Sequence, residues 1–148
     1  MDLWTVCERG HVHWGQAGGA GFLFRYLPER GEASYLLLQR SKLVDYAGTW
    51  GVPGGARRHG ESPEATARRE AEEEVGTLPS YRVTGVNVQD CGGGWKFHLV
   101  TADVDDPFLA YCGKETDATG WFTQADMQNM NLHPGLRRWL NEQQSGSP

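Results

Sequence analysis

The chain has 148 residues, of which 39% are hydrophobic and 22% charged, and its formal net charge is -5. This length suits one globular domain covering residues 1–148, and the composition excludes wholesale disorder. The acidic balance gives the chain no general attraction to a nucleic-acid backbone. The N-terminus is too polar for a signal peptide, no apolar run is long enough to cross a membrane, and three scattered cysteines make no disulfide framework. We therefore expect a cytoplasmic protein.

Five apolar or alternating runs, bounded by Gly, Pro and Asp, predict strands over 19–25, 34–39, 81–89, 96–104 and 119–123. A helix is predicted between them, with Ser62 as N-cap, Pro63 at the first helical position and Gly76 at the C-terminal cap. A second helix is predicted in "HPGLRRWLNEQ", followed by a frayed tail over about 143–148. Strands with a few helices between them indicate a mixed sheet covered by helices.

The first helix carries an unusual density of acid in "REAEEEVG". At 3.6 residues per turn, Glu70, Glu73 and Glu74 share one face, while Glu72 points away. A narrow apolar stripe beside them is made by Ala67, Ala71 and Val75. Three carboxylates on one face repel one another unless a cation lies among them, and hard cations prefer oxygen ligands. A solvated acidic surface is the alternative, and the helix alone does not exclude it.

The segment before this helix favours a built site. Two adjacent glycines, Gly54 and Gly55, allow the backbone to approach a ligand closely. From Gly55 the chain reads GARRHGESPEATARREAEEEVGT, which resembles the Nudix box, G-x5-E-x7-R-E-U-x-E-E-x-G-U, where U is a bulky aliphatic residue. Every glycine, glutamate and arginine of that pattern is present. The chain departs from it at Ala71, which is small, and at Thr77, which is polar, and both are packing positions.

This resemblance implies an α/β (α+β) fold, the Nudix-type α/β/α sandwich around a mixed β-sheet. Most members hydrolyse a nucleoside diphosphate linked to another moiety, using Mg²⁺, for which Mn²⁺ can substitute. By position in the box, the implied general base is Glu70 or Glu73. The implied metal ligands are Glu70, Glu73, Glu74 and the backbone carbonyl of Gly54. The implied supporting residues are Gly55, Glu61, Arg69 and Gly76.

Residues outside the box complete the predicted site. The segment "GKETDATGW" resembles the one that supplies a further acidic ligand in the oxidised-dGTP pyrophosphatase branch of the family, which points to Glu115, with Asp117 as the competing candidate. Arg40 matches an arginine that contacts substrate in that branch, and its planar donor fork suits phosphate. A surface arginine at a strand end is the other interpretation. Trp50 precedes the glycine loop and is the tryptophan expected nearest the substrate.

The stretch "HVHWG" is a second candidate for a metal site, because His11 and His13 share one face of an extended chain near Cys7. No matching second pair with zinc-ligand spacing exists in the sequence. Ordinary edge-strand histidines, or a pair that lines the substrate, are therefore the better interpretation.

The predicted reaction is Mg²⁺-dependent conversion of a nucleoside triphosphate to a monophosphate and pyrophosphate. The asparagine that reads the oxidised base in that branch has no counterpart near "NLHPGLRR". A nucleotide-sugar or dinucleoside polyphosphate hydrolase is the alternative, although Cys91 and Gly93 stand where ADP-ribose and diadenosine tetraphosphate enzymes place a proline and a tyrosine. A nucleotide-binding module without hydrolysis is the other alternative. We expect a small nucleotide as partner, with no membrane or polymeric nucleic acid, and the family allows a homodimer.

Overall fold

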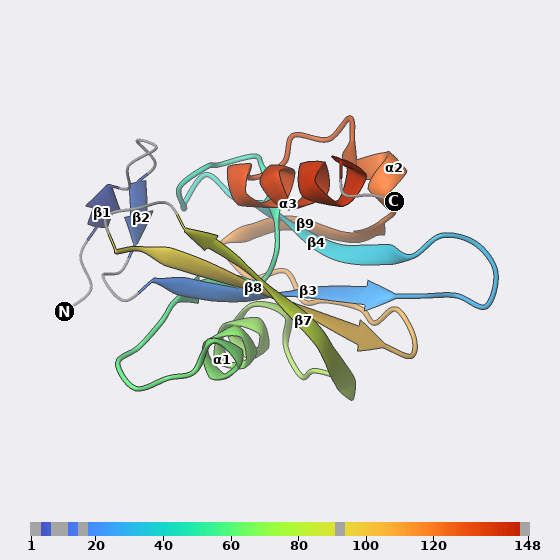
Figure 1. Ribbon diagram of the computed structural model, residues 1–148, viewed down its shortest axis with the longest axis horizontal. Coiled ribbons are helices and arrows are strands. Elements are labelled where there is room, and N and C mark those ends of the chain that lie inside the picture. Colours follow the sequence, from blue (N-terminus) through green and yellow to red (C-terminus); the bar gives the residue numbers. More distant parts are fainter. Residues whose placement is uncertain (1–3, 7–11, 15–17, 91–93, 146–148) are drawn as a thin grey trace.

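The computed structural model describes residues 4–6, 12–14, 18–90 and 94–145 (Figure 1). Within these residues, β1 (Trp4–Val6) and β2 (Val12–Trp14) form a small antiparallel sheet. The main mixed sheet contains β3 (Gly19–Tyr26), β4 (Ser34–Arg40), β5 (Trp50–Gly51), β6 (Gly54–Ala56), β7 (Tyr81–Asp90), β8 (Lys96–Val104) and β9 (Thr116–Phe122). The helices are α1 (Pro63–Val75), α2 (Gln124–Met127) and α3 (Pro134–Ser145).

The five predicted strands are confirmed as β3, β4, β7, β8 and β9, and the two predicted helices as α1 and α3. Strand β9 begins at Thr116 rather than at residue 119, because it pairs with β4 through a register shift at Gln39 and Arg40. The predicted fraying from residue 143 is wrong up to Ser145, where α3 ends. Helix α3 buries Leu136, Trp139 and Leu140, and this packing stabilises the whole helix, including its polar C-terminal residues.

Strands β3 and β4 diverge, and this split shapes the site. They pair with each other only near their loop, at Arg25 with Tyr35 and Tyr26 with Ser34. Away from that loop, β3 pairs with β6, and β4 pairs with β5 and β9. On its other edge, β3 pairs in parallel with β8 along its whole length. The glycine-rich segment 50–56 therefore fills the gap between the two central strands. This segment leads directly into α1.

Helices cover both faces of the sheet, as the predicted sandwich requires (Figure 1). On one face, Ala67, Ala71 and Val75 of α1 are buried against apolar side chains of β3, β4 and β8. The other face packs against α2 and α3, in a second core that includes Leu23, Leu37, Leu99, Met127 and Leu140. Small side chains on α1 let its backbone lie close to the sheet, so the acidic face beside this stripe is held at the sheet's edge. None of the described helices is long and apolar enough to span a membrane.

Both ends of α1 have the predicted caps. The Ser62 hydroxyl accepts the N–H of Ala65 at 3.1 Å, and Pro63 occupies the first turn. At the other end Gly76 has a φ of 92°, a conformation that disfavours a Cβ, and its N–H donates to the Glu72 carbonyl at 3.2 Å. These caps fix where the helix starts and stops, and so fix which glutamates face the loop before it.

Candidate active site

The glutamates of α1 divide between two sides of the helix, as the periodicity predicts. Glu70 and Glu74 are partly buried beside segment 54–56, and the side chain of Glu73 is 53% exposed on the same face. Glu72 is exposed on the other side, where its carboxylate pairs with Arg68 at 3.0 Å. The chain therefore presents three carboxylates together and leaves the fourth in solvent.

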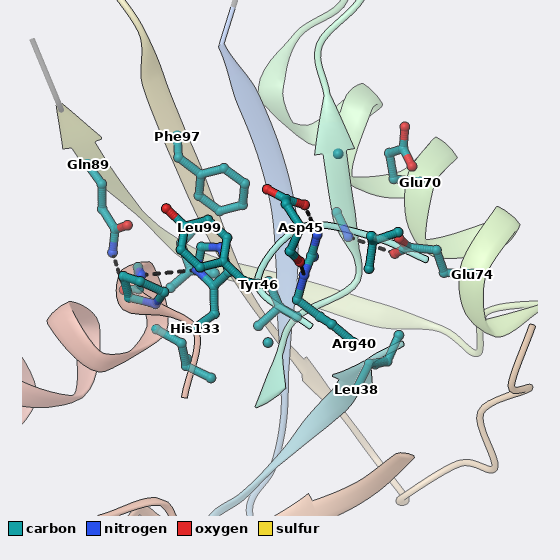
Figure 2. Close-up of a pocket in the computed structure, with 18 of the residues that line it drawn as sticks. Leu38, Arg40, Asp45, Tyr46, Glu70, Glu74, Gln89, Phe97, Leu99 and His133 are labelled. Carbon is teal, nitrogen blue, oxygen red and sulfur yellow. Dashed lines mark hydrogen bonds and ion pairs between the residues drawn. The ribbon is translucent and has the colours of Figure 1, made fainter. Parts of the chain in front are cut away.

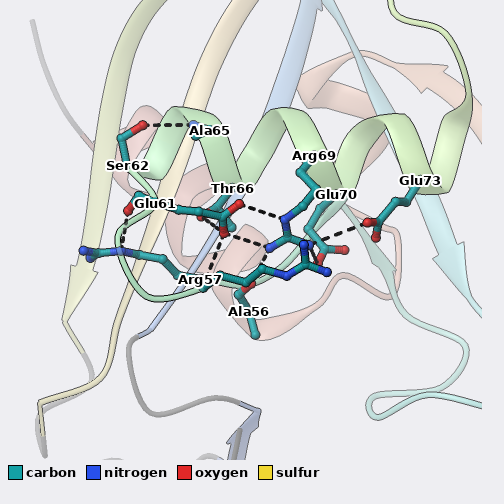
Figure 3. Close-up of polar contacts among 10 residues, drawn as sticks. Ala56, Arg57, Glu61, Ser62, Ala65, Thr66, Arg69, Glu70 and Glu73 are labelled. Atoms are coloured by element: carbon teal, nitrogen blue, oxygen red, sulfur yellow. Dashed lines mark hydrogen bonds and ion pairs between the residues drawn. The ribbon is translucent and has the colours of Figure 1, made fainter. Parts of the chain in front are cut away.

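Arg69 links these carboxylates to the loop that precedes the helix (Figure 3). Its Nε and Nη2 donate to both oxygens of Glu61, at 2.8 and 2.9 Å, and Nη1 donates to Glu70 at 2.9 Å. Nη2 also donates to the Ala56 carbonyl at 3.0 Å, while Glu73 lies 3.7 Å from Nη1. The supporting role predicted for Arg69 thus has a geometric basis: one guanidinium joins loop, helix and carboxylate face.

Several hydrogen bonds hold the carboxylate of Glu61, at the loop end of this network, in place. Besides Arg69, the backbone N–H of Arg58 and the hydroxyl of buried Thr66 donate to its carboxylate, at 2.8 and 3.1 Å. These hydrogen bonds, that from Arg69 above all, lower the pKa of Glu61 to about 2. The loop 57–61 is therefore anchored through an ionised carboxylate.

We predict that Glu61→Gln lowers the free energy of unfolding by about 2 kcal/mol at pH 7, because hydrogen bonds to a charged group are lost. The pKa of Glu61 is depressed in the folded state, so its stabilisation is fully present above the ordinary pKa of 4.5 and is lost as pH falls toward 2. Urea unfolding of both proteins at several pH values between 7 and 3 measures the difference. We expect it to shrink below about pH 5; a difference independent of pH would contradict this assignment.

The two predicted glycines lie directly against the carboxylates. The Gly54 N–H donates to Glu74 Oε2 at 2.8 Å (Figure 2). A Cβ on Gly55 would stand 2.5 Å from the Glu70 carboxyl carbon, so glycine is needed there for the carboxylate to occupy its place. Burial raises the pKa of Glu74 to about 8, with the negative charge of Glu70 adding to the effect. Burial likewise raises the pKa of Glu70, against the opposing hydrogen bond from Arg69.

The loop before β9 brings Glu115 to the same place. Its carbonyl accepts the N–H of Ser41, which ties the loop to the end of β4. Glu115 lines a hollow of about 280 Å³ together with Glu70, Glu73 and Glu74. Asp117 is exposed on β9 and lines neither this hollow nor the larger cavity described below. Of the two candidate acids, the structure therefore places Glu115 with the α1 carboxylates.

The donor set suits a hard divalent cation, since it combines several carboxylates with a backbone carbonyl oxygen. Among the described residues, however, no three acidic, histidine or cysteine side chains are already gathered as a ready-made metal cage. The reason is visible in the contacts: Glu74 is turned to the Gly54 N–H and Glu70 to Arg69. Protein N–H groups thus donate to the carboxylates of Glu74 and Glu70. The exposed Glu73 and Glu115 line the hollow.

A cavity of about 1010 Å³ extends from these glutamates to the start of α3 (Figure 2). Arg40 lines it, with its guanidinium donating to both the carbonyl and the carboxylate of Asp45. Trp50 is not among the lining residues. Its ring packs on Phe122 at 5.1 Å in the second core, because strand β5 turns it to that face. The substrate contact expected of Trp50 stays a prediction, and the ring itself packs in the second core.

Sequence reasoning missed the far end of this cavity. Tyr46, Gln89 and His133 come from three distant segments and line it together with Phe97 and Leu99. The available signal was weak: Gln89 is a polar residue at an inward position of a strand, where an apolar residue is expected. The interpretation of His11 and His13 as edge-strand or substrate-lining histidines stays a prediction, since these side chains and that of Cys7 lie outside the described residues.

Comparison with known proteins matches this architecture to a family. The model of the NUDIX domain matches residues 20–143. The chain belongs to the NUDIX domain family. The matched range contains the whole predicted box, the loop that carries Glu115 and most of α3. Divalent metal ions are the general cofactors of Nudix hydrolases, and small nucleotides are their substrates.

Three similar proteins place the chain within this NUDIX domain family. A Mycobacterium tuberculosis protein named "Putative 8-oxo-dGTP diphosphatase 3" is 35% identical over 141 residues, which are 91% of this chain and 65% of the relative's length. A Bifidobacterium longum fusion of nucleoside triphosphate pyrophosphatase and Nudix hydrolase is 38% identical over 104 residues, 68% of this chain and 21% of the relative. The crystal structure of the M. smegmatis Nudix hydrolase RenU has a TM-score of 0.83 at 31% identity, covering 97% of this chain and 93% of that one. This chain thus spans about two thirds of the M. tuberculosis relative.

Proposed function

We propose that this NUDIX domain hydrolyses a diphosphate linkage in a nucleotide, with Mg²⁺ as the metal ion. The observation that carries the proposal is one continuous cavity with two unlike ends. Carboxylates from α1 and the Glu115 loop line one end, and aromatic rings line the other. A nucleotide has the same polarity, since its phosphates bind cations and its base is flat and largely apolar.

Residues at the acidic end have distinct roles in this proposal. Glu70, Glu73, Glu74 and Glu115, with the Gly54 carbonyl, would hold the divalent ion, which neutralises phosphate oxygens and lowers the pKa of water when bound. Glu70 or Glu73 removes a proton from the attacking water. The water oxygen then bonds to phosphorus as the bridging P–O bond breaks, and the leaving phosphate takes the bonding electrons. Arg69 and Glu61 act as positioning residues, because they hold Glu70 through the network already described.

Arg40 provides positive charge between the two ends of the cavity. Its guanidinium is held by Asp45 and lies close enough to Glu74 to offset a small part of the rise in the pKa of that carboxyl that burial causes. A planar fork held in this way can turn its remaining donors toward a phosphate chain that runs from the glutamates to the aromatic end. Arg40 therefore stays a candidate substrate contact, with the phosphates as its ligand.

The M. tuberculosis relative suggests the substrate class. Because its name refers to 8-oxo-dGTP, we propose a nucleoside triphosphate that is cleaved to monophosphate and pyrophosphate. The test is a panel of normal and oxidised nucleoside triphosphates, ADP-ribose, a nucleotide sugar and a dinucleoside polyphosphate, each incubated with and without Mg²⁺. We expect a triphosphate to be cleaved fastest, with monophosphate and pyrophosphate as products that require Mg²⁺.

The other outcomes of this panel name the alternatives. Preferred cleavage of ADP-ribose, the nucleotide sugar or the dinucleoside polyphosphate would move the chain to another substrate class within the family. Binding of a nucleotide by folded protein, without turnover of any compound, would make the chain a nucleotide-binding module and refute the proposed hydrolysis. Ligand-induced stabilisation against heat detects such binding independently of turnover.

A further inference from the structure

The end of the cavity away from α1 is a chamber with aromatic walls (Figure 2). The rings of Tyr46 and His133 contact each other there, with centroids 4.7 Å apart and planes at 65°, and Phe97 and Leu99 of β8 also line the chamber. Tyr46 has a φ of 53°, which is uncommon for a residue with a side chain. Its carbonyl accepts hydrogen bonds from the N–H and the hydroxyl of Thr49, at 3.1 and 2.7 Å. This wall is therefore held by a hydrogen-bonded turn.

The amide side chain of Gln89, on β7, also reaches into this chamber. It is 5% exposed, and its Nε2 donates to the Gly135 carbonyl at 2.7 Å, at the start of α3. That hydrogen bond fixes which end of the amide is nitrogen, because a carbonyl cannot accept from Oε1. Oε1 is directed to the cavity side of the amide (Figure 2). Oε1 is open to the cavity rather than sealed in the core, and no hydrogen bond from another described residue reaches it.

An acceptor oxygen on a largely buried side chain, open to the cavity, can accept a hydrogen bond from a donor that arrives with a ligand. A ligand that fills the chamber displaces water from this oxygen, and an acceptor that then has no partner is unfavourable, so a ligand that supplies an N–H in this place gains affinity over one that does not. The aromatic walls favour a flat ring system, and a larger ring system stacks on more of their surface. A flat bicyclic ring with N–H groups on its edge is a purine base.

We propose that Gln89 is a specificity-determining residue, whose Oε1 accepts a hydrogen bond from an N–H on the edge of a purine base held in this chamber. The inference rests on the proposed function, because it takes the cavity as a nucleotide site with phosphates toward α1 and base toward α3. The amide that recognises the base then belongs to strand β7, and its hydrogen bond to the Gly135 carbonyl of α3 fixes its orientation.

The test measures binding without turnover. Dissociation constants are determined by calorimetry, without metal, for guanine, 8-oxoguanine, adenine, cytosine and thymine nucleoside monophosphates, with ribose 5-phosphate as the reference that lacks a base. For wild type we expect a purine to bind best. Gln89→Met keeps the side-chain length and removes the acceptor, and should reduce the preference of the best purine over the pyrimidines by about 10-fold. The ribose 5-phosphate constant should not change.

The chain offers a matched control and a second probe. Asn87 lies two residues earlier on the same face of β7 and also joins α3, through Glu142 at 3.0 Å, but it does not line the cavity. Asn87→Ala should therefore leave the purine preference intact. Gly135→Ala keeps Gln89 but would place a Cβ 2.8 Å from Oε1, which displaces the amide end. Gly135→Ala should lower the preference for purines over pyrimidines as Gln89→Met does. If Gln89→Met does not fold, this variant alone tests the role of Gln89.

Several results would overturn the inference: equal binding of all bases by wild type, an unchanged purine preference in folded Gln89→Met or Gly135→Ala, or an equal loss of affinity for ribose 5-phosphate. The last result would make Gln89 a purely structural link between β7 and α3. Failure of the proposed function gives a different pattern. Base preference that depends on Gln89, in a protein that hydrolyses nothing in the substrate panel, would refute the enzyme and leave this inference standing.

Discussion

Replacing Glu73 by Gln should lower kcat for nucleotide hydrolysis by about 10²- to 10⁴-fold, the contribution typical of a positioned acid–base group. Glutamine retains the length of the side chain, but it brings no negative charge to a cation and accepts no proton from water. The side chain of Glu73 is 53% exposed, so the change opens no cavity in the core. We therefore expect the variant to fold normally, as thermal unfolding can verify, and the measurement is initial rate against substrate concentration at saturating Mg²⁺.

Glu72→Gln is the matched control for this experiment. It removes the same charge from the same helix one residue away, on the side where Glu72 pairs with Arg68 in solvent. Its kcat should stay within about twofold of wild type, since surface ion pairs of this kind contribute little. Equal losses in both variants would mean that the overall charge of α1 matters and that its two faces do not differ, and the assignment of the catalytic face would be wrong.

A single methyl group on the loop should produce the second large effect. Gly55→Ala would place Cβ 2.5 Å from the carboxyl carbon of Glu70, much closer than any non-bonded contact allows. Either Glu70 or segment 54–56 must move, and both carry predicted metal ligands. Displacing a catalytic group by about 1 Å can cost about 10²-fold in rate. We expect that loss in kcat/KM, with a weaker response to Mg²⁺, from steady-state rates at several Mg²⁺ concentrations.

Gly85→Ala, on strand β7, controls for the general cost of adding a methyl group to a glycine in this sheet. The nearest atom to its Cβ would be the Thr101 hydroxyl at 3.4 Å, an ordinary van der Waals contact. Its kcat/KM should remain close to that of wild type. If Gly55→Ala retained full activity, the close fit between the loop and Glu70 would have no catalytic importance.

The carboxylate face could be predicted from sequence because it depends on local geometry. Once the caps at Ser62 and Gly76 define α1, helical periodicity alone separates Glu73 from Glu72, and the structure has them on different sides. Gly55 and Arg69 likewise make their contacts within one loop and one helix. The spacing of residues along the chain is enough to predict such short-range relationships.

The remaining features depend on contacts between distant segments. Strands β5 and β6 are too short for a periodic pattern and exist because the divergence of β3 and β4 leaves partners for segment 50–56. Trp50 is the first residue of that segment, and the direction of its side chain is set by the pairing of β5 with β4. The chamber at Gln89 depends on the docking of α3, which brings Gly135 to β7 from 46 residues away. No local pattern predicts that meeting.

A titration with Mn²⁺, followed by electron paramagnetic resonance in the absence of nucleotide, tests the central claim most directly. It asks whether one face of α1 binds a divalent cation, independently of any substrate or turnover. We predict that wild type and Glu72→Gln bind Mn²⁺ with the same affinity and that Glu73→Gln binds it at least about 10-fold more weakly. Equal affinities in all three proteins would contradict the account, because the shared face of Glu70, Glu73 and Glu74 would then not be the cation site.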